Sequence, residues 1–193
     1  MENDLNLSTL LFAQAGATNT EACLQVACQR AKTLGLSEVV VASCSGETAY
    51  RILDYIDPAE LNLIVVTHVT GFRNANEQEM KDSIRLDLED KGCRVLTCAH
   101  AFGGVGRGLR SKLYTYQVDE VMAYTLRMFG QGVKVCVEIS LMSADAGMVR
   151  TDQKILAIGG TVSGADTSMV ITPANSHNCL ELKIHEIICK PGL

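Results

Sequence analysis

Residues 39–49 of this chain have the sequence Val39-Val40-Val41-Ala42-Ser43-Cys44-Ser45-Gly46-Glu47-Thr48-Ala49. An unbroken run of valines is typical of a strand that is covered on both faces of a sheet. The serine and glycine residues that follow predict a tight turn into a helix over residues 46–56. A buried strand that leads directly into a helix is a building unit of α/β folds.

The same alternation continues on both sides of this unit. A capping box, Thr18 to Glu21, predicts a helix that ends near residue 34, and an amphipathic helix is expected over residues 77–91. Apolar runs predict strands over residues 61–66 and 93–98. Strands joined by helices of this length pair in parallel through right-handed crossovers. We therefore expect a three-layer α/β/α sandwich and a single domain over residues 1–193.

The second half of the chain is less regular. Residues 99–115 predict a long loop containing Gly103–Gly108, either a plain surface loop or a mobile lid whose Arg107 or Arg110 could meet a phosphate. A helix is expected over residues 118–129. Apolar and polar residues then alternate over 133–142, which predicts a strand with one less buried face. Further strands are expected over residues 154–158, 169–172 and 180–188, the last two at the edge of the sheet.

Composition limits the classes of function. The 193 residues carry a net charge of −5 without a basic run, so a nucleic-acid partner is not expected. No apolar stretch is long enough to cross a membrane, and Met1–Asp4 is acidic where a secretory signal is basic. We expect a cytoplasmic protein. The eight cysteines lack metal-ligand spacing, so we expect no metal site and interpret most of them as buried apolar residues.

The first candidate site is the segment Ser43–Thr48 between a buried strand and a helix. Unpaired backbone N–H groups and a partial positive charge at a helix start, together with serine and threonine hydroxyls, can hold a phosphate. Gly46 would let the backbone approach that phosphate, so we expect valine at this position to block it. The alternative is that Ser45 only caps the helix and Gly46 only makes the turn.

The second candidate site is the glycine-rich segment Gly159–Thr167, which also follows a strand expected to be central. Its glycines would let backbone amides face a ligand. The alternative is a flexible turn into the next strand.

Three segments carry a resemblance to a known family. Val40–Ala49 resembles the strand, loop and helix of the C-terminal domain of pyruvate kinase, and so do Val65-Val66-Thr67 and Ile155–Thr167. The chain is still more similar to stand-alone proteins of this fold. With them it shares the motifs Asn19-Thr20-Glu21, Thr67-His68-x-x-Gly71-Phe72, Gln131-Gly132-x-Lys134-Val135, Asp145-Ala146-Gly147 and Gly164-Ala165-Asp166-Thr167.

The resemblance implies both a topology and a ligand. Strands centred on Val39, Leu63, Val95, Ile155 and Met169, numbered 1 to 5, would have the order 3-2-1-4-5, with the last antiparallel. In allosteric pyruvate kinases the two candidate loops hold the phosphates of a sugar bisphosphate, and the stand-alone proteins imply flavin mononucleotide (FMN) as ligand. The site residues expected on this basis are Ser43, Cys44, Ser45, Gly46, Glu47, Thr48, Thr67, Gly160, Thr161 and Gly164.

The chain also departs from the kinase pattern. Pyruvate kinase catalysis resides in a TIM barrel, for which 193 residues leave no room, so we expect no pyruvate kinase activity. Glu47 stands where the kinase domain often has arginine, which favours a monophosphate over a bisphosphate. Residues 134–150 have no counterpart in the kinase domain and are expected to form an added strand and loop.

Three classes of function remain open. The first is a binder of a phosphate-bearing small molecule such as FMN. The second is an enzyme that uses such a ligand, with His68, His100 or Asp145 as proton carriers, although each is more often structural. The third is a structural subunit with a vestigial pocket. A redox role for Cys44 is a weaker alternative. Apolar edge strands over residues 172–188 also predict a homo-oligomer.

Overall fold

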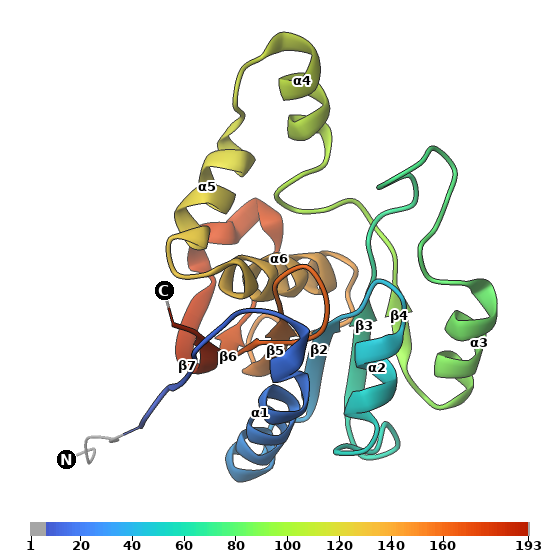
Figure 1. The fold of residues 1–193 in the computed structure, drawn as a ribbon, viewed down its shortest axis with the longest axis vertical. Helices are drawn as coiled ribbons and strands as arrows, with labels where there is room; N and C mark the ends of the chain where they lie inside the picture. Colours follow the sequence, from blue (N-terminus) through green and yellow to red (C-terminus); the bar gives the residue numbers. More distant parts are fainter. Residues whose placement is uncertain (1–6, 193) are drawn as a thin grey trace.

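A single seven-stranded sheet organises the computed structural model, which describes residues 7–192; the acidic segment Met1–Asp4 lies outside them. The strand order is β1-β7-β6-β5-β2-β3-β4 (Figure 1). The strands are β1 (Leu10–Phe12), β2 (Glu38–Ala42), β3 (Asn62–Val66), β4 (Arg94–Leu96), β5 (Ile155–Gly159), β6 (Thr167–Thr172) and β7 (Lys183–Pro191). The two central strands, β2 and β5, are adjacent and parallel, whereas β6 runs antiparallel to β5. The predicted order of the five strands β4-β3-β2-β5-β6 is therefore confirmed.

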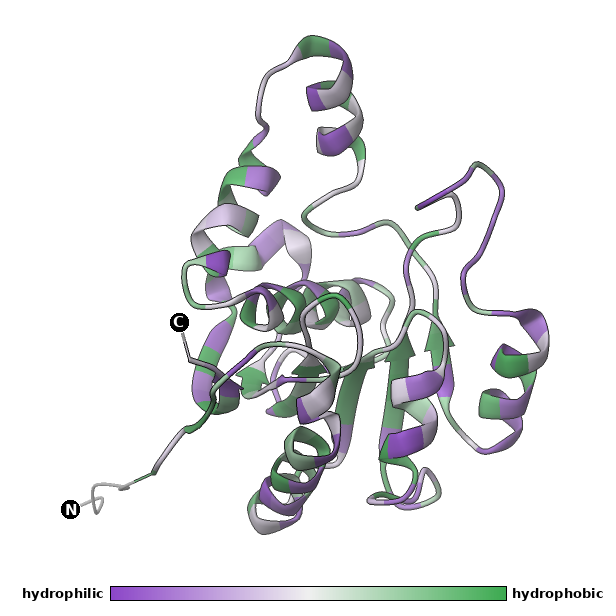
Figure 2. Ribbon diagram, viewed as in Figure 1, coloured by the Kyte–Doolittle hydropathy of each residue, from purple (hydrophilic) through white to green (hydrophobic). Residues whose placement is uncertain are grey.

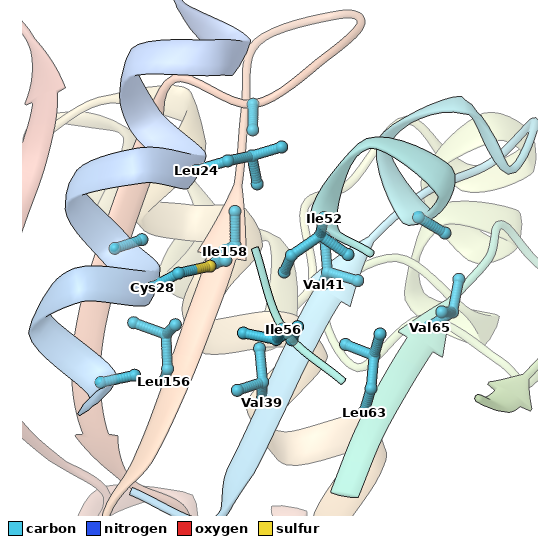
Figure 3. Packing of buried hydrophobic residues seen from close by; sticks show 14 of the residues in the cluster. Leu24, Cys28, Val39, Val41, Ile52, Ile56, Leu63, Val65, Leu156 and Ile158 are labelled. Carbon is cyan, nitrogen blue, oxygen red and sulfur yellow. The ribbon is translucent and has the colours of Figure 1, made fainter. Parts of the chain in front are cut away.

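Side chains alternate between the two faces of the sheet and build two separate cores. Val39 and Val41 face one core, and Val40 faces the other. The first core is covered by α1 (Thr20–Leu34), α2 (Glu47–Ile52) and α3 (Asp82–Asp90). Figure 3 shows α1 and α2 contributing Leu24, Cys28 and Ile52 to this core against Val41, Leu63 and Ile158. The sheet is apolar through its centre while the outer helices alternate in hydropathy (Figure 2), as expected of a three-layer sandwich.

The second core is covered by a helix where we expected a strand. Residues 131–145 form α6 (Gln131–Asp145), so the predictions of a strand over 133–142 and of an added strand and loop over 134–150 are wrong. Twelve of its 15 residues are buried, because β5 and β6 lie on one side and α5 (Val118–Arg127) and η2 (Ser176–Glu181) on the other. A helix that is buried almost all round loses the 3.6-residue pattern, and its β-branched residues then imitate a strand.

Residues 99–115 are also more ordered than expected. They contain α4 (Val105–Leu113), which with α5 forms an arm that extends beyond the sheet (Figure 1). None of the residues of α4 is buried. Glycine at positions 106 and 108 lowers helix propensity, which is why this segment resembled a loop in the sequence.

Several ends and edges differ from the prediction. The start of α1 has no side-chain cap; the short helix η1 (Ala17–Asn19) precedes it, and the Thr20 hydroxyl donates to Ala17 O (2.7 Å), so the predicted capping box is wrong. The helix after Gly46 ends at residue 52 and α3 begins at residue 82, so both are shorter than expected. Strand β7 begins at residue 183 and lies between β6 and β1, so the prediction that residues 169–172 and 180–188 form the edge of the sheet is wrong. The two edge strands are β1 and β4. Among the helices of residues 7–192, none has the length and apolarity needed to cross a bilayer.

Candidate functional site

The two candidate loops face one another at the carboxyl ends of β2 and β5, where the chain reverses its direction of travel through the sheet. Between them lies a cavity of about 430 Å³, here called the outer cavity. Seven of the ten predicted site residues line it: Ser43, Cys44, Ser45, Glu47, Thr48, Gly160 and Gly164. Thr67 lines a neighbouring cavity, and Gly46 and Thr161 line neither.

The hydroxyls of the first loop have different roles. Ser43 Oγ is buried and accepts a hydrogen bond from Ala49 N (3.3 Å), so it fixes the first turn of α2. Ser45 is exposed to the cavity, and its Oγ accepts only a long hydrogen bond from Glu47 N (3.5 Å). The capping role that we considered for Ser45 is thus filled mainly by Ser43, and Ser45 is the hydroxyl best placed to meet a ligand.

Gly46 serves packing and does not face the cavity. Its φ of +94° is a left-handed conformation that favours glycine, and a Cβ atom there would lie 2.5 Å from Ile84 Cγ2. The expectation that valine at this position would block a phosphate is therefore wrong, because the side chain would strike α3 instead.

The glycines of the second loop also allow close packing. A Cβ at Gly160 would lie 2.4 Å from Gly164 O, and a Cβ at Gly164 would lie 2.4 Å from Thr20 Oγ1. Thr20 Oγ1 in turn accepts a hydrogen bond from Ala165 N (3.1 Å). The loop is thus held against the start of α1, and Val162 stands exposed at its tip with a φ of +67°.

A second cavity of about 240 Å³, here called the inner chamber, lies beside the outer cavity. Six residues line both: Ala42, Cys44, His68, Phe72, Gln131 and Val135. The titratable side chains that line only the inner chamber are those of His100, Arg107, Arg127, Lys134 and Glu138. None of these was among the predicted ligand-binding residues. The sequence had suggested His100 as a proton carrier and Arg107 as a phosphate contact, and had shown Lys134 only within a motif shared with the stand-alone proteins.

The inner chamber contains a buried ion pair. Lys134 Nζ donates to Glu138 Oε2, and each residue is only 4% exposed. Glu138 Oε1 also accepts a hydrogen bond from Phe102 N (3.0 Å). Burial lowers the pKa of Lys134, although the negative charge of Glu138 opposes this effect. The sequence did carry a signal for this pair, since a lysine and a glutamate four residues apart face one another only on a helix.

His100 is held as a neutral ring. Burial lowers its pKa to about 4, against the opposing charge of Glu138. Its Nε2 accepts a hydrogen bond from Val69 N (3.2 Å), which requires the proton of the neutral ring to be on Nδ1. The Nε2 lone pair is therefore already engaged, and His100 is a poor candidate for a general base.

His68 stands between the two cavities. Its Nδ1 lies 2.5 Å from Glu79 Oε2, and Glu79 Oε1 accepts from Arg73 Nε at 2.7 Å. Burial raises the pKa of Glu79, but hydrogen bonds and charge from His68 and Arg73 outweigh it and leave that pKa below its ordinary value. Phe72 stacks on His68 with ring centroids 3.9 Å apart and so covers the junction of the two cavities.

The remaining candidates have structural surroundings. Burial raises the pKa of Cys44 to about 11, so its thiol stays protonated near neutral pH and a thiolate role is not supported. Asp145 lines neither cavity; it accepts hydrogen bonds from Ser176 N (2.9 Å) and from the amide of Asn175 (3.3 Å), which hold η2. All eight cysteines are free, and residues 7–192 contain no cluster of three or more potential metal ligands.

Comparison with known proteins identifies the family. A family model described as "Pyruvate kinase, alpha/beta domain" matches residues 21–171. Among solved structures, Cryptosporidium parvum pyruvate kinase in complex with ADP matches 88% of this chain with a TM-score of 0.40 and 12% identity. The chain spans 23% of the length of that kinase. The match to the family model covers well over half of the 193 residues, and the chain therefore belongs to the pyruvate kinase alpha/beta domain family.

Proposed function

We propose that the outer cavity binds a small phosphate-bearing molecule. The observation that carries this proposal is that the two loops line one cavity beyond the carboxyl ends of β2 and β5, where the strand order reverses. Ligands of open α/β sheets bind at such a point. Ser45, Ser163 and the backbone of the Gly160–Gly164 loop supply hydrogen-bonding groups to this cavity. Arg73 supplies a positive charge at its rim.

The charges around the outer cavity favour one phosphate group over two. Glu47 lines the cavity, although Arg51 partly offsets its charge through an ion pair of 2.8 Å. Arg73 is likewise shared with Glu79. A single phosphate near neutral pH carries nearly two negative charges, and a second one beside Glu47 would be repelled.

FMN is the ligand that we propose for this cavity. A volume of about 430 Å³ lies within the range of small-molecule sites, and the cavity continues into the inner chamber past Phe72 and His68. These stacked rings offer an aromatic face to a planar heterocycle. FMN combines such a heterocycle with a single phosphate.

A second candidate function is an enzyme that uses the phosphate-bearing ligand. The observation in its favour is the buried Lys134–Glu138 pair beside the outer cavity. Buried charges at a cavity often mark a reactive site, because they are costly to retain for stability alone.

The Ser45 hydroxyl provides the most direct test of phosphate binding. We expect Ser45→Ala to weaken FMN binding by about ten- to a hundredfold, because a charge-assisted hydrogen bond is worth about 1.5–3 kcal/mol. Quenching of flavin fluorescence during titration measures the affinity, and the colour of the freshly purified protein shows whether flavin is retained.

Riboflavin, which lacks the phosphate, is the matched ligand control. Its affinity should be the same for wild type and Ser45→Ala, and thermal melting should show that the fold is kept. Equal FMN affinities for the two proteins would mean that the phosphate does not meet Ser45.

The resemblance to pyruvate kinase also yields an expectation for activity. We expect the purified 193-residue chain to form no pyruvate from phosphoenolpyruvate and ADP, because the catalytic residues of pyruvate kinases lie in a TIM barrel. A coupled assay on successive chromatography fractions measures this. Activity that follows the protein through the fractions would refute the expectation.

A further inference from the structure

The inner chamber holds more positive than negative charge. Arg107, Arg127 and Lys134 line it together with one carboxylate, that of Glu138, and this carboxylate is already paired with Lys134. Arg127 Nε donates to the neutral amide of Gln131 (2.7 Å), and the guanidinium of Arg107 lies 5.6 Å from the centroid of the Phe72 ring.

Neither arginine has a compensating acid. Within residues 7–192, no carboxylate forms a salt bridge with Arg107 or Arg127, whereas Arg110, on the same helix as Arg107, pairs with Glu120 at 2.6 Å. The positive charges of these two arginines act on Lys134 in the chamber. Burial is the main cause of the lowered pKa of Lys134, and the charges of Arg127 and Arg107 lower it further.

Charges in this setting are expected to attract an anion. Charged side chains that line a partly enclosed cavity attract an opposite charge more strongly than they would in bulk water. Arginine presents a planar set of donors that matches the oxygens of a carboxylate or a phosphate. An oxyanion between Arg107 and Arg127 would supply the missing negative charge.

The size of the chamber limits what can occupy it. A volume of about 240 Å³ is below the range of about 300–1,000 Å³ that is usual for drug-sized ligands. Phe72 and Phe102 add apolar surface near the cations; Lys134 Nζ lies 5.9 Å from the centroid of the Phe102 ring. A short-chain carboxylic acid or a small phosphate matches both the volume and the charge.

We propose that the inner chamber is a separate binding site for a small oxyanion, held by Arg107 and Arg127 and next to the ligand of the outer cavity. The juxtaposition with a phosphate-bearing molecule rests on the proposed function, whereas the oxyanion site itself does not. The arrangement would place a small acidic substrate beside a larger bound cofactor. It would also explain why α6 brings Lys134 and Glu138 into an otherwise apolar core.

The ring of His100 lines the chamber and reports on its occupancy. His100 lines the inner chamber only, whereas His68 lines both cavities. The chain has four histidines, so their ring proton signals can be resolved by NMR and assigned with His100→Gln. We expect malonate and inorganic phosphate to shift the His100 signal saturably, and malonamide, the neutral relative of malonate, to leave it unchanged.

Substitutions distinguish the two sites. Arg107→Gln and Arg127→Gln should each weaken malonate binding about tenfold or more. Arg150→Gln is the matched control, because Arg150 pairs with Asp152 on an exposed turn away from both cavities. Ser45→Ala should leave malonate binding unchanged even where it weakens FMN binding.

Two other results would overturn the proposal. A His100 signal that does not move, or that moves equally with malonamide, would mean that the chamber binds no oxyanion. Loss of malonate binding in Ser45→Ala but not in Arg127→Gln would assign the anion to the outer cavity. If FMN fails to bind while malonate still shifts His100, the proposed function fails and the oxyanion site stands.

Discussion

Replacing Glu138 with alanine is expected to lower the free energy of unfolding by about 3–5 kcal/mol, because it would leave the buried ammonium of Lys134 without its partner. The substitution would also remove the acceptor of Phe102 N, which is buried with it. Both losses act in the same direction. Denaturant titration of wild type and variant, analysed with a shared slope, measures the difference.

Three further variants separate charge from packing at this position. Glu138→Gln keeps an acceptor for Phe102 N but removes the charge, so it should cost less than alanine. The double variant Lys134→Met with Glu138→Gln should be close to wild type in stability, since it removes both buried charges and keeps an acceptor for Phe102 N. Asp152→Ala breaks an exposed pair with Arg150 and should change stability by about 0–1 kcal/mol.

The double variant also bears on function. If it is as stable as wild type, then the Lys134–Glu138 pair is not required for folding, and its retention in the chamber needs another reason. A Glu138→Ala protein of unchanged stability would contradict the burial on which both the enzyme alternative and the oxyanion proposal depend.

The elements of the fold that could be predicted from the sequence are those with a strong local hydrophobic pattern. The valines of β2 and the apolar run of β3 have few alternatives in an α/β chain, and both strands formed where expected. The pairing of β2 with β5 followed from the resemblance, because those strands are more than 100 residues apart and no local pattern could join them. The short strand β1 was missed because its three residues are too few to show a period.

The site was only half visible in the sequence for a related reason. Turns rich in serine and glycine mark the outer cavity, and most of the residues that we expected there do line it. The inner chamber depends on α6, which we interpreted as a strand. As a strand, residues 134 and 138 would be about 13 Å apart, whereas one helical turn brings them together. The error in secondary structure therefore concealed the ion pair.

Gly132 also shows what the sequence could not reveal. In the sequence it stands only as one residue of the motif Gln131-Gly132-x-Lys134-Val135, whereas the structure gives it a contact that no larger residue can make. A Cβ atom there would lie 2.4 Å from Thr167 Cβ and 2.9 Å from Asp166 Oδ1. Gly132 is thus the point at which α6 lies directly on β6.

Gly132→Ala is accordingly expected to lower the free energy of unfolding by about 1–2 kcal/mol. Thr167 and Asp166 are fully buried, so neither can move aside, and Asp166 also accepts a hydrogen bond from Gly16 N (2.9 Å). Overpacking of this kind typically costs about 1–3 kcal/mol, which exceeds the gain of up to about 1 kcal/mol from the better helix propensity of alanine. Thermal or denaturant unfolding measures the net effect.

Gly108→Ala in α4 is the matched control, since it makes the same exchange within a helix but its Cβ would meet no atom within 4 Å. It should raise stability by about 0.5–1 kcal/mol, because only the propensity gain remains. Changes of opposite sign in the free energy of unfolding for the two substitutions would show that the loss at Gly132 comes from the contact between α6 and β6.

The same contact fixes the start of α6, and Lys134 lies two residues further along. Displacement of the helix should therefore also weaken malonate binding in the inner chamber. A Gly132→Ala protein as stable as wild type would mean that α6 can shift on the sheet, and the close fit that positions Lys134 would then be wrong.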